Sequence, residues 1–337
     1  MSEEPARRRA TIYDVARAAN VSHQTVARLV GGASNINDEM RVRITTAIDE
    51  LHYLPNLRAR DLARHRNRLL GAIVSYTSEL GPNREVQGAI LAAREAGYTL
   101  DVVNIDRNNA DSYREALQQF EAKDVAGVLV QASTDELLSA AESQHSLVPV
   151  YIEHADERDD TNFMQVDAHG TSLLVDHLFD QGHRRFYYIG GPGNWVSARL
   201  RRQGFWVALA KHELEPIGES HGDWSARSGY DSVTNLADVL EFSALVAGND
   251  QMALGALRAL ADKGIHVPDQ VSVAGFDNLP DSEFYNPPLT TVAQDSDRQG
   301  RLAISRLLDT VEGRPATAAE AIRAQLVVRT STAEAAV

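Results

Sequence analysis

The segment SHQTVARLVGG, residues 22–32, carries side chains that could read chemical groups on a partner molecule. His23, Gln24 and Arg28 are long hydrogen-bonding residues with no acidic residue among them. Glutamine can pair with adenine through two hydrogen bonds, arginine with guanine or a phosphate, and histidine can donate to base edges. Each such base contact contributes roughly 1–3 kcal/mol of discrimination. The alternative is three ordinary surface residues, and this segment alone does not decide between the two.

The same segment has the spacing of a short helix. Ser22 can cap its start, and the two glycines after Val30 can end it. Val26, Leu29 and Val30 follow one another at i, i+3 and i+4, which places them on one face. The polar residues would then lie opposite an apolar surface that packs on neighbouring elements.

Two further helices are expected around this one. Thr11 begins the first, with Asp14 three residues later as an approximate capping box. Asn37 caps a third, which continues at helical spacing to Leu51. Residues 18–21 form the turn between the first two helices. Two short helices joined by a tight turn and braced by a third make a helix-turn-helix, whose second helix enters the DNA major groove.

Charge is divided unevenly along the chain. Residues 1–68 hold 12 basic and 8 acidic residues, a net charge of +4, whereas the whole chain carries −14, so the remainder carries −18. A basic head on an acidic body indicates that only the head meets a polyanion. A solvated basic tail is equally compatible with charge alone.

From residue 69 onward, apolar runs alternate with amphipathic segments. This alternation predicts parallel sheets covered by helices, and its restart after Asp167 predicts two similar lobes. Ligands of such sheets bind beyond the carboxyl ends of the strands. The predicted strands are 69–75, 98–104, 126–131, 148–153, 184–191, 243–249 and 271–277.

Polar residues stand where several of these strands end. Asn249 and Asp277 terminate two of them, and Arg199 and Trp224 lie nearby in the segments that follow others. Sugar hydroxyls both donate and accept hydrogen bonds, so carboxylate, amide and guanidinium groups beside an aromatic ring suit a polyhydroxylated ligand. Structural alternatives remain open: Asn249 can cap a helix over 250–262, Asp277 can open a turn, Arg199 can be solvated and Trp224 can be core.

Composition and motifs argue against other classes of protein. The chain has no cysteine, which removes disulfides, thiolate nucleophiles and cysteine zinc sites. It has no G-x-G-x-x-G, P-loop, H-E-x-x-H or G-x-S-x-G motif, so no enzymatic activity, cofactor or bound metal is expected.

The start MSEEPARRRA lacks the apolar stretch of a signal peptide, and no apolar run reaches the ~18 residues of a membrane span. We expect a cytoplasmic, nucleoid-associated protein. The remaining rival is a transport-type sugar-binding protein, which would share the two-lobed body but lack the DNA-reading head.

The head resembles the DNA-binding headpiece of the LacI/GalR family of transcriptional regulators. The motifs T-x-Y-D-V-A, A-x-V-S-x-Q-T-V-x-R and L-x-Y-x-P-N follow one another over residues 11–56. The resemblance implies that His23, Gln24 and Arg28 read bases, while Tyr13 and Tyr53 help dock the DNA backbone. The full set of expected DNA contacts is Thr11, Tyr13, Ser22, His23, Gln24, Thr25, Arg28, Asn37, Tyr53, Asn56, Ala59 and Leu62.

Residues 56–67 resemble the hinge of the same family. Asn56 can cap a short helix, which would be marginal in isolation. The resemblance implies that two such helices, one per subunit, place Leu62 in the minor groove, with Ala59 packed beside it, and kink the DNA. Without the family context, a flexible arginine-rich linker is the simpler interpretation.

The body resembles the sugar-responsive members of this family through VSARLRRQGFWVAL, GDWSARSGY, GNDQMALGALRAL, VSVAGFDN and NPPLTTVAQD. The resemblance implies hydrogen bonds from Arg199, Asn249 and Asp277 to sugar hydroxyls, with Trp224 against the sugar ring and Gln294 near the cleft floor. His154 stands where the family has a sugar-contacting Asp, so we expect a galactoside-type core site with an altered second side. The expected effector contacts are Ser75, His154, Arg199, Trp224, Asn249, Asp277 and Gln294.

The expected fold is an α/β chain with an all-α helix-turn-helix headpiece and a two-lobed, parallel-sheet effector domain of the periplasmic-binding type. The headpiece would cover 1–55 and the hinge 56–67. The N-subdomain would cover 68–165 and 294–323, and the C-subdomain 166–293 and 324–337. No leucine heptad follows the body, so the expected assembly is a homodimer on a pseudo-palindromic operator of double-stranded DNA. A galactoside-like inducer would release it, the alternative being a different sugar or a corepressor.

Overall fold

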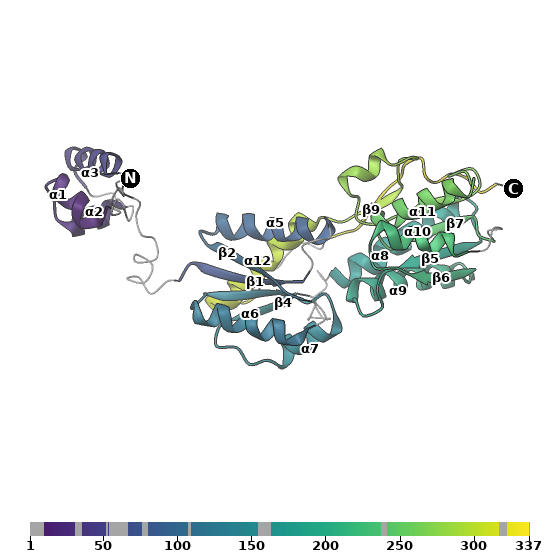
Figure 1. Cartoon of the computed structure of the whole chain (residues 1–337), viewed down its shortest axis with the longest axis horizontal. Helices are drawn as coiled ribbons and strands as arrows, with labels where there is room; N and C mark the ends of the chain where they lie inside the picture. The colour runs from purple at the N-terminus through teal and green to yellow at the C-terminus, as the bar shows by residue number, and fades with distance from the viewer. Residues whose placement is uncertain are drawn as a thin grey trace, which may run out of the picture. The chain divides into compact units, whose positions relative to one another are not determined.

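The computed structural model describes residues 10–30, 36–51, 53, 67–75, 80–106, 109–153, 163–236, 241–316 and 322–336. The chain divides into two compact units, Met1–Asn67 and Arg68–Val337 (Figure 1). The predicted hinge, with Asn56, Ala59 and Leu62, and the glycines expected to end the second helix lie outside the described residues.

The first unit contains the three predicted helices. They are α1 (Ile12–Ala18), α2 (His23–Val30) and α3 (Asp38–Glu50). Their predicted caps are confirmed: the Thr11 hydroxyl accepts from the Asp14 amide at 3.4 Å, and the Asp14 carboxylate accepts from the Thr11 amide at 2.9 Å. The Asn37 side chain accepts from the Glu39 amide at 2.8 Å, and the Ser22 hydroxyl accepts from the Thr25 amide at 3.1 Å.

One apolar cluster holds these helices together. Val15, Val26 and Ile44 contribute a fully buried side chain from each helix, and Leu29 and Val30 pack against them as expected. Leu51, predicted on the same face of α3, is instead 37% exposed because it stands beyond the last turn of the helix.

The turn between α1 and α2 is fixed by an arginine from α3. Asn20 has a φ of 53°, a left-handed conformation that asparagine tolerates better than most residues. The Arg43 guanidinium donates to the carbonyl oxygens of Ala19 at 3.0 Å and Asn20 at 3.2 Å. The angle between the first two helices is therefore set by the third.

The second unit contains two four-stranded parallel sheets, as the strand–helix alternation predicts. The sheet orders are β2-β1-β3-β4 and β6-β5-β7-β8, so the two lobes repeat one topology. The strands are β1 (Leu69–Val74), β2 (Thr99–Asn104), β3 (Gly127–Gln131), β4 (Val150–Glu153), β5 (Phe186–Gly190), β6 (Gly218–His221), β7 (Ala244–Ala247) and β8 (Ser272–Ala274).

Helices cover both sheets, and Figure 1 shows α12, late in the chain, lying beside α5 in the first lobe. The helices are α5 (Leu80–Glu95), α6 (Ala110–Ala122), α7 (Asp135–Ser143), α8 (Phe163–Asp180), α9 (Val196–Lys211), α10 (Ala226–Thr234), α11 (Asp250–Asp262), α12 (Ser296–Glu312) and the short 3-10 helix η1 (Pro280–Phe284). Apolar clusters on the two faces of each sheet form the cores of the lobes.

The chain passes between the lobes more than once. Strand β9 (Thr291–Ala293) pairs antiparallel with β10 (Gln325–Val327), and α12 lies between them in sequence. The sequence did not predict β6, β9 or β10. Strand β6 has the sequence GESH at a sheet edge, without an apolar run, and β9 and β10 have three residues each. In the part of the chain that the structure describes, no helix is long and apolar enough to cross a membrane.

Two glycines allow α5 and α12 to pack closely. A Cβ on Gly300 would overlap the backbone carbonyl of Glu85, and a Cβ on Gly88 would overlap that of Asp297. This contact anchors α12 in the first lobe, although the segment of β9 is bound to the second lobe. There the Gly275 amide donates to the Thr290 carbonyl and the Asp277 amide to the Val292 carbonyl, both at 2.9 Å.

Replacing Gly300 with alanine tests this contact. We expect Gly300→Ala to lower the free energy of unfolding by about 1–3 kcal/mol, because the added methyl group forces the helices apart. Gly193→Ala is the matched control, since a Cβ there meets nothing within 4 Å. Urea denaturation measures both, and equal stability of the two variants would contradict the close packing.

Candidate functional site

The polar face of α2 is presented to solvent as predicted. Ser22, His23, Gln24 and Arg28 are exposed, while Val26 on the opposite face is buried. The Tyr13 side chain from α1 is 60% exposed, and its ring centroid lies 5.1 Å from that of His23. Polar and aromatic groups from two helices thus share one surface.

Other predicted residues of the head have structural roles that the structure records. Thr11 and Asn37 cap helices, and Ser22 and Thr25 hydrogen-bond to each other at 2.8 Å through their hydroxyls. Tyr53 is half-buried against the apolar cluster of the head, and this burial raises the pKa of its phenol. None of these contacts prevents an added contact to a phosphate.

In the second unit, the carboxyl-terminal edges of the two sheets meet at one seam. The Val196 amide donates to the Ser133 carbonyl at 3.2 Å, and the Asp135 amide to the Asn194 carbonyl at 3.3 Å. Thr134 and Trp195 form the antiparallel bridge between them. Residues 133–135 follow β3 and residues 194–196 follow β5, so the place where a ligand is expected in such sheets is also the place where the lobes touch.

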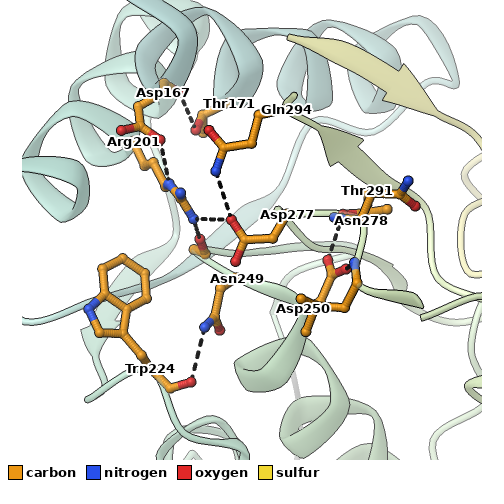
Figure 2. A network of polar contacts seen from close by, with 12 residues as sticks. Asp167, Thr171, Arg201, Trp224, Asn249, Asp250, Asp277, Asn278, Thr291 and Gln294 are labelled. Carbon is orange, nitrogen blue, oxygen red and sulfur yellow. Dashed lines mark hydrogen bonds and ion pairs between the residues drawn. The ribbon is translucent and has the colours of Figure 1, made fainter. Parts of the chain in front are cut away.

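Arg201 is the centre of a buried ionic network beside this seam (Figure 2). Its Nε donates to Asp167 at 2.8 Å, and its Nη1 lies 3.1 Å from the Asp277 carboxylate. Nη1 also donates to the Gly248 carbonyl at 2.7 Å. Burial alone would lower the pKa of Arg201, but the carboxylates of Asp277 and Asp167 reverse this and raise it, so the guanidinium stays charged.

The sequence analysis expected Arg199, and not Arg201, to hydrogen-bond a ligand. In the structure the Arg199 guanidinium pairs with Asp135 of the other lobe, at 2.6 Å and 2.8 Å, with 45% of its side chain exposed. Arg201 falls on the buried face of α9 with Ala198 and Phe205, at i−3 and i+4, whereas Arg199 does not. Helical phase was therefore the signal that could have distinguished the two arginines.

Trp224 and Asn249 are joined at the second lobe's edge of the seam. The Asn249 side chain donates to the Trp224 carbonyl at 3.0 Å and accepts from the Met252 amide at 2.8 Å. Asn249 thus caps α11, as in the alternative interpretation of the sequence in which it caps a helix over residues 250–262. Trp224 is 5% exposed at a φ of 72°, and its indole Nε1 has no hydrogen-bond partner among the described residues.

An aromatic pair lines the same place. The Trp195 ring lies edge-on to that of Trp224, with centroids 5.8 Å apart, and Gly191 leaves room for the Trp224 indole, which any Cβ there would overlap. Trp195 was not among the predicted site residues, because one aromatic residue in a loop carries no periodic signal.

Asp277 stands in a turn that carries left-handed backbone at two consecutive residues. The φ is 104° at Asp277 and 47° at Asn278. The Asp277 Oδ1 accepts from the Gln294 side chain at 3.2 Å as well as lying 3.1 Å from Arg201. Burial raises the pKa of Asp277, and Arg201 opposes that shift without cancelling it. Among the described residues, the Asp277 Oδ2 has no hydrogen-bond partner, so it can accept one from a ligand.

Asp250, the first residue of α11, is a buried carboxyl group that sequence reasoning missed. It accepts from the Thr291 hydroxyl at 2.5 Å and from the Leu279 amide at 2.8 Å. Burial and the neighbouring Asp277 raise the pKa of Asp250 to about 7. This carboxyl therefore ties the turn after β8 to strand β9.

The first lobe contributes Ser75, whose hydroxyl bonds that of Ser133 at 2.6 Å beside the seam. His154 lies outside the described residues, but the preceding Glu153 ends β4 and is fully buried. The structure therefore brings together Arg201, Asp277, Gln294, Asn249 and Trp224, and places Arg199 at the lobe contact.

The chain is similar to bacterial regulators over nearly its whole length. A family model described as bacterial regulatory proteins, lacI family, matches residues 11–56, and one for a periplasmic binding protein-like domain matches residues 175–332. The lactose operon repressor of Escherichia coli (strain K12) is 34% identical over 325 residues, covering 96% of this chain and 90% of that protein.

A second relative and a solved structure are also similar over nearly the whole chain. The transcriptional repressor PurR of Mannheimia succiniciproducens is 32% identical over 96% of this chain and 98% of its own. The crystal structure of the lac repressor dimer bound to operator and the anti-inducer ONPF superposes with a TM-score of 0.86 at 32% identity, covering 97% of this chain and all of that one.

Replacing the two arginines of α9 separately tests the buried network. We expect Arg201→Met to lower the free energy of unfolding by about 3–5 kcal/mol, because it leaves two buried carboxylates without their cation. Arg199→Met removes an exposed pair worth about 0–1 kcal/mol and is the control. Chemical denaturation of both variants measures this, and equal losses would contradict the assignment of Arg201 as the centre.

The pH dependence of stability tests Asp250. Because its folded pKa is raised from 3.8 to about 7, the folded state holds a proton that the unfolded state has lost between those pH values. Stability should therefore fall by up to about 1.4 kcal/mol per pH unit as pH rises through this window. Asp250→Asn should lose that slope, while the exposed Asp269→Asn should keep it. An unchanged slope in Asp250→Asn would contradict the raised pKa.

Proposed function

Because this chain belongs to the LacI family of bacterial regulatory proteins, we propose that it is a transcriptional repressor that binds operator DNA as a homodimer and is released by a galactoside-like sugar. The observation that carries the proposal is the combination, in one chain, of the exposed polar face of α2 with the polar network at the lobe seam. A repressor of this kind would act at the nucleoid in the cytoplasm. We propose no enzymatic activity for it.

DNA recognition is proposed for α2. His23 and Gln24 stand in its first turn, the part of a recognition helix that reaches base edges, and Arg28 stands one turn later on the exposed side. Tyr13 adds a hydroxyl beside them for a phosphate. Thr11, Ser22, Thr25, Asn37 and Tyr53 are proposed as further contacts to the DNA on the resemblance of the head. Asn56, Ala59 and Leu62 are proposed on the resemblance of the hinge alone. We propose a head over residues 1–55, a hinge over 56–67, an N-subdomain over 68–165 and 294–323, and a C-subdomain over 166–293 and 324–337. The division of the chain into two compact units after Asn67 supports the limit at 67.

Effector binding is proposed at the lobe seam. A sugar hydroxyl can donate to the Asp277 Oδ2, and neighbouring hydroxyls can accept from Arg201 and Gln294. The indole N–H of Trp224 has no partner among the described residues and is a further donor nearby. A contact between the Trp224 ring and the sugar is proposed on the resemblance alone. Ser75 contributes a hydroxyl from the first lobe, so a ligand held by both lobes would bias how they pack.

The homodimer and its two-fold operator are proposed from similarity. The lac repressor structure to which this chain is similar is a dimer on its operator. Two identical heads related by a two-fold axis read two half-sites, which makes the operator pseudo-palindromic. A second candidate function is that of a repressor of the same family whose ligand is a different sugar or acts as a corepressor, which tightens DNA binding.

Operator binding in the presence of sugars tests the function. An operator is first selected from a library of palindromic DNA, and its affinity for the full chain is followed by fluorescence anisotropy. We expect a galactoside in the panel to weaken binding. A sugar that tightens binding would establish the corepressor alternative, and absence of a selectable operator would contradict the proposal.

A variant of α2 tests base reading. Gln24→Ala should weaken binding to the selected operator by about 1–3 kcal/mol while leaving binding to random DNA unchanged, because a base contact carries specificity. Thr46→Ala, an exposed change on α3 away from this face, is the control. Equal losses on both DNAs would make Gln24 a docking residue.

A further inference from the structure

A row of polar side chains runs along the carboxyl-terminal edge of the first sheet. Gln131 is the last residue of β3 and Glu153 the last of β4, and the two stand directly opposite each other in the strand register. Ser75 follows the end of β1, which pairs with the other side of β3. The parallel strands therefore place all three on the edge that faces the lobe seam.

Two of these side chains are buried without a hydrogen bond of normal geometry. Gln131 and Glu153 are both 0% exposed. Among the described residues, neither the two carboxyl oxygens of Glu153 nor the amide oxygen and nitrogen of Gln131 has a hydrogen bond. Ser75 does not supply one, since its hydroxyl bonds Ser133. Buried polar groups are almost always paired, and an exception calls for an explanation such as a ligand.

The electrostatic surroundings of Glu153 are unfavourable for its charge. Burial raises the pKa of Glu153. Hydrogen bonding by the side chains of Glu85 from α5 and Gln131, which falls short of normal geometry, opposes that shift without cancelling it. A second carboxyl group thus stands close to the first inside the lobe. An opposite charge placed beside them would favour ionisation, whereas another negative charge would be repelled.

Arg201 in the second lobe has no surplus positive charge that could balance a carboxylate across the seam. That guanidinium is already shared between Asp167 and Asp277. Residues 133–135, which follow the strand of Gln131, contact the loop that leads into α9, the helix of Arg201. The acidic edge of the first sheet and the network of Arg201 therefore flank the same seam.

We propose that Glu153 and Gln131 form an amine-selective subsite of the effector site, which favours sugars bearing a protonated amine over their neutral parents and rejects anionic sugars. The subsite rests on the proposed function. An ammonium group has three donors and no acceptor, so it can satisfy a Glu153 oxygen and the Gln131 carbonyl oxygen together. A neutral hydroxyl has one proton to donate, and a carboxylate or phosphate has none.

Calorimetric titration of the full chain tests the subsite. The ligands are methyl glycosides of the galacto and gluco series, each as the neutral parent, the 2-amino, the 6-amino and the 6-carboxylate form. In at least one series we expect one amino sugar to bind about tenfold or more tightly than its neutral parent. A tenfold difference in affinity has the same free energy as a shift of one pKa unit. The carboxylate form should bind more weakly than the parent.

Two variants connect the preference to Glu153. Glu153→Gln should abolish the advantage of the amine over its neutral parent, whereas Glu136→Gln, a change of an exposed carboxyl in the same lobe, should keep that advantage. The subsite is overturned if a neutral parent binds and its amino forms bind no more tightly. It is also overturned if the tighter binding of the amino form survives Glu153→Gln. If Glu153→Gln does not fold, the comparison of amine with carboxylate on the unaltered chain decides.

The failure of the function has a different signature. If no sugar of either series binds or changes operator affinity, the proposed sugar response fails together with the subsite. If neutral sugars bind and change operator affinity but the amine gives no advantage, only the subsite fails.

Discussion

The second unit depends on the sharing of one buried guanidinium by two carboxylates. Arg201 connects Asp167 on α8, Asp277 after β8 and the carbonyl of Gly248 after β7. Charges of this kind are costly to bury alone, and removing one partner typically costs more than the pair contributes. The three segments must therefore stay in register with α9, and they include the turn of Asp277, which is the proposed ligand acceptor.

This constraint extends beyond the charged residues through Asp250. That carboxyl holds the Leu279 amide and the Thr291 hydroxyl, so the turn containing Asp277 and strand β9 share one anchor. The chain leaves β9 for α12, which packs against α5 in the first lobe. A ligand that binds Asp277 therefore acts on a segment continuous with the helix that crosses to the other lobe. Differential binding to two arrangements of the lobes is the physical requirement for an effector response.

Much of this architecture could be predicted from the sequence because local chemistry determines it. Thr11 and Asn37 cap their helices as their types and spacing indicate, and seven strands follow from apolar runs. The edge strand β6 could not be found that way, because its polar sequence has no periodicity. At the candidate effector site, the sequence indicated which types of polar residue gather at the strand ends, but it did not indicate which partners those side chains have. Asn249 stands at the seam, but its side-chain amide is hydrogen-bonded to α11 and to the Trp224 carbonyl. To choose between Arg199 and Arg201, one would have needed the helical phase of α9. Glu153 and Asp250 were missed, since burial of a carboxyl is a tertiary property.

Hydrogen exchange measured with and without the sugar that releases the operator tests the central claim most directly. If the effector binds at the network of Arg201, the backbone amides of residues 248–252 and 275–279 should become more protected, because the ligand holds the segments that Arg201 and Asp250 connect. If operator affinity changes while exchange in these two segments stays the same, the sugar acts elsewhere and the account of the seam as the effector site is wrong.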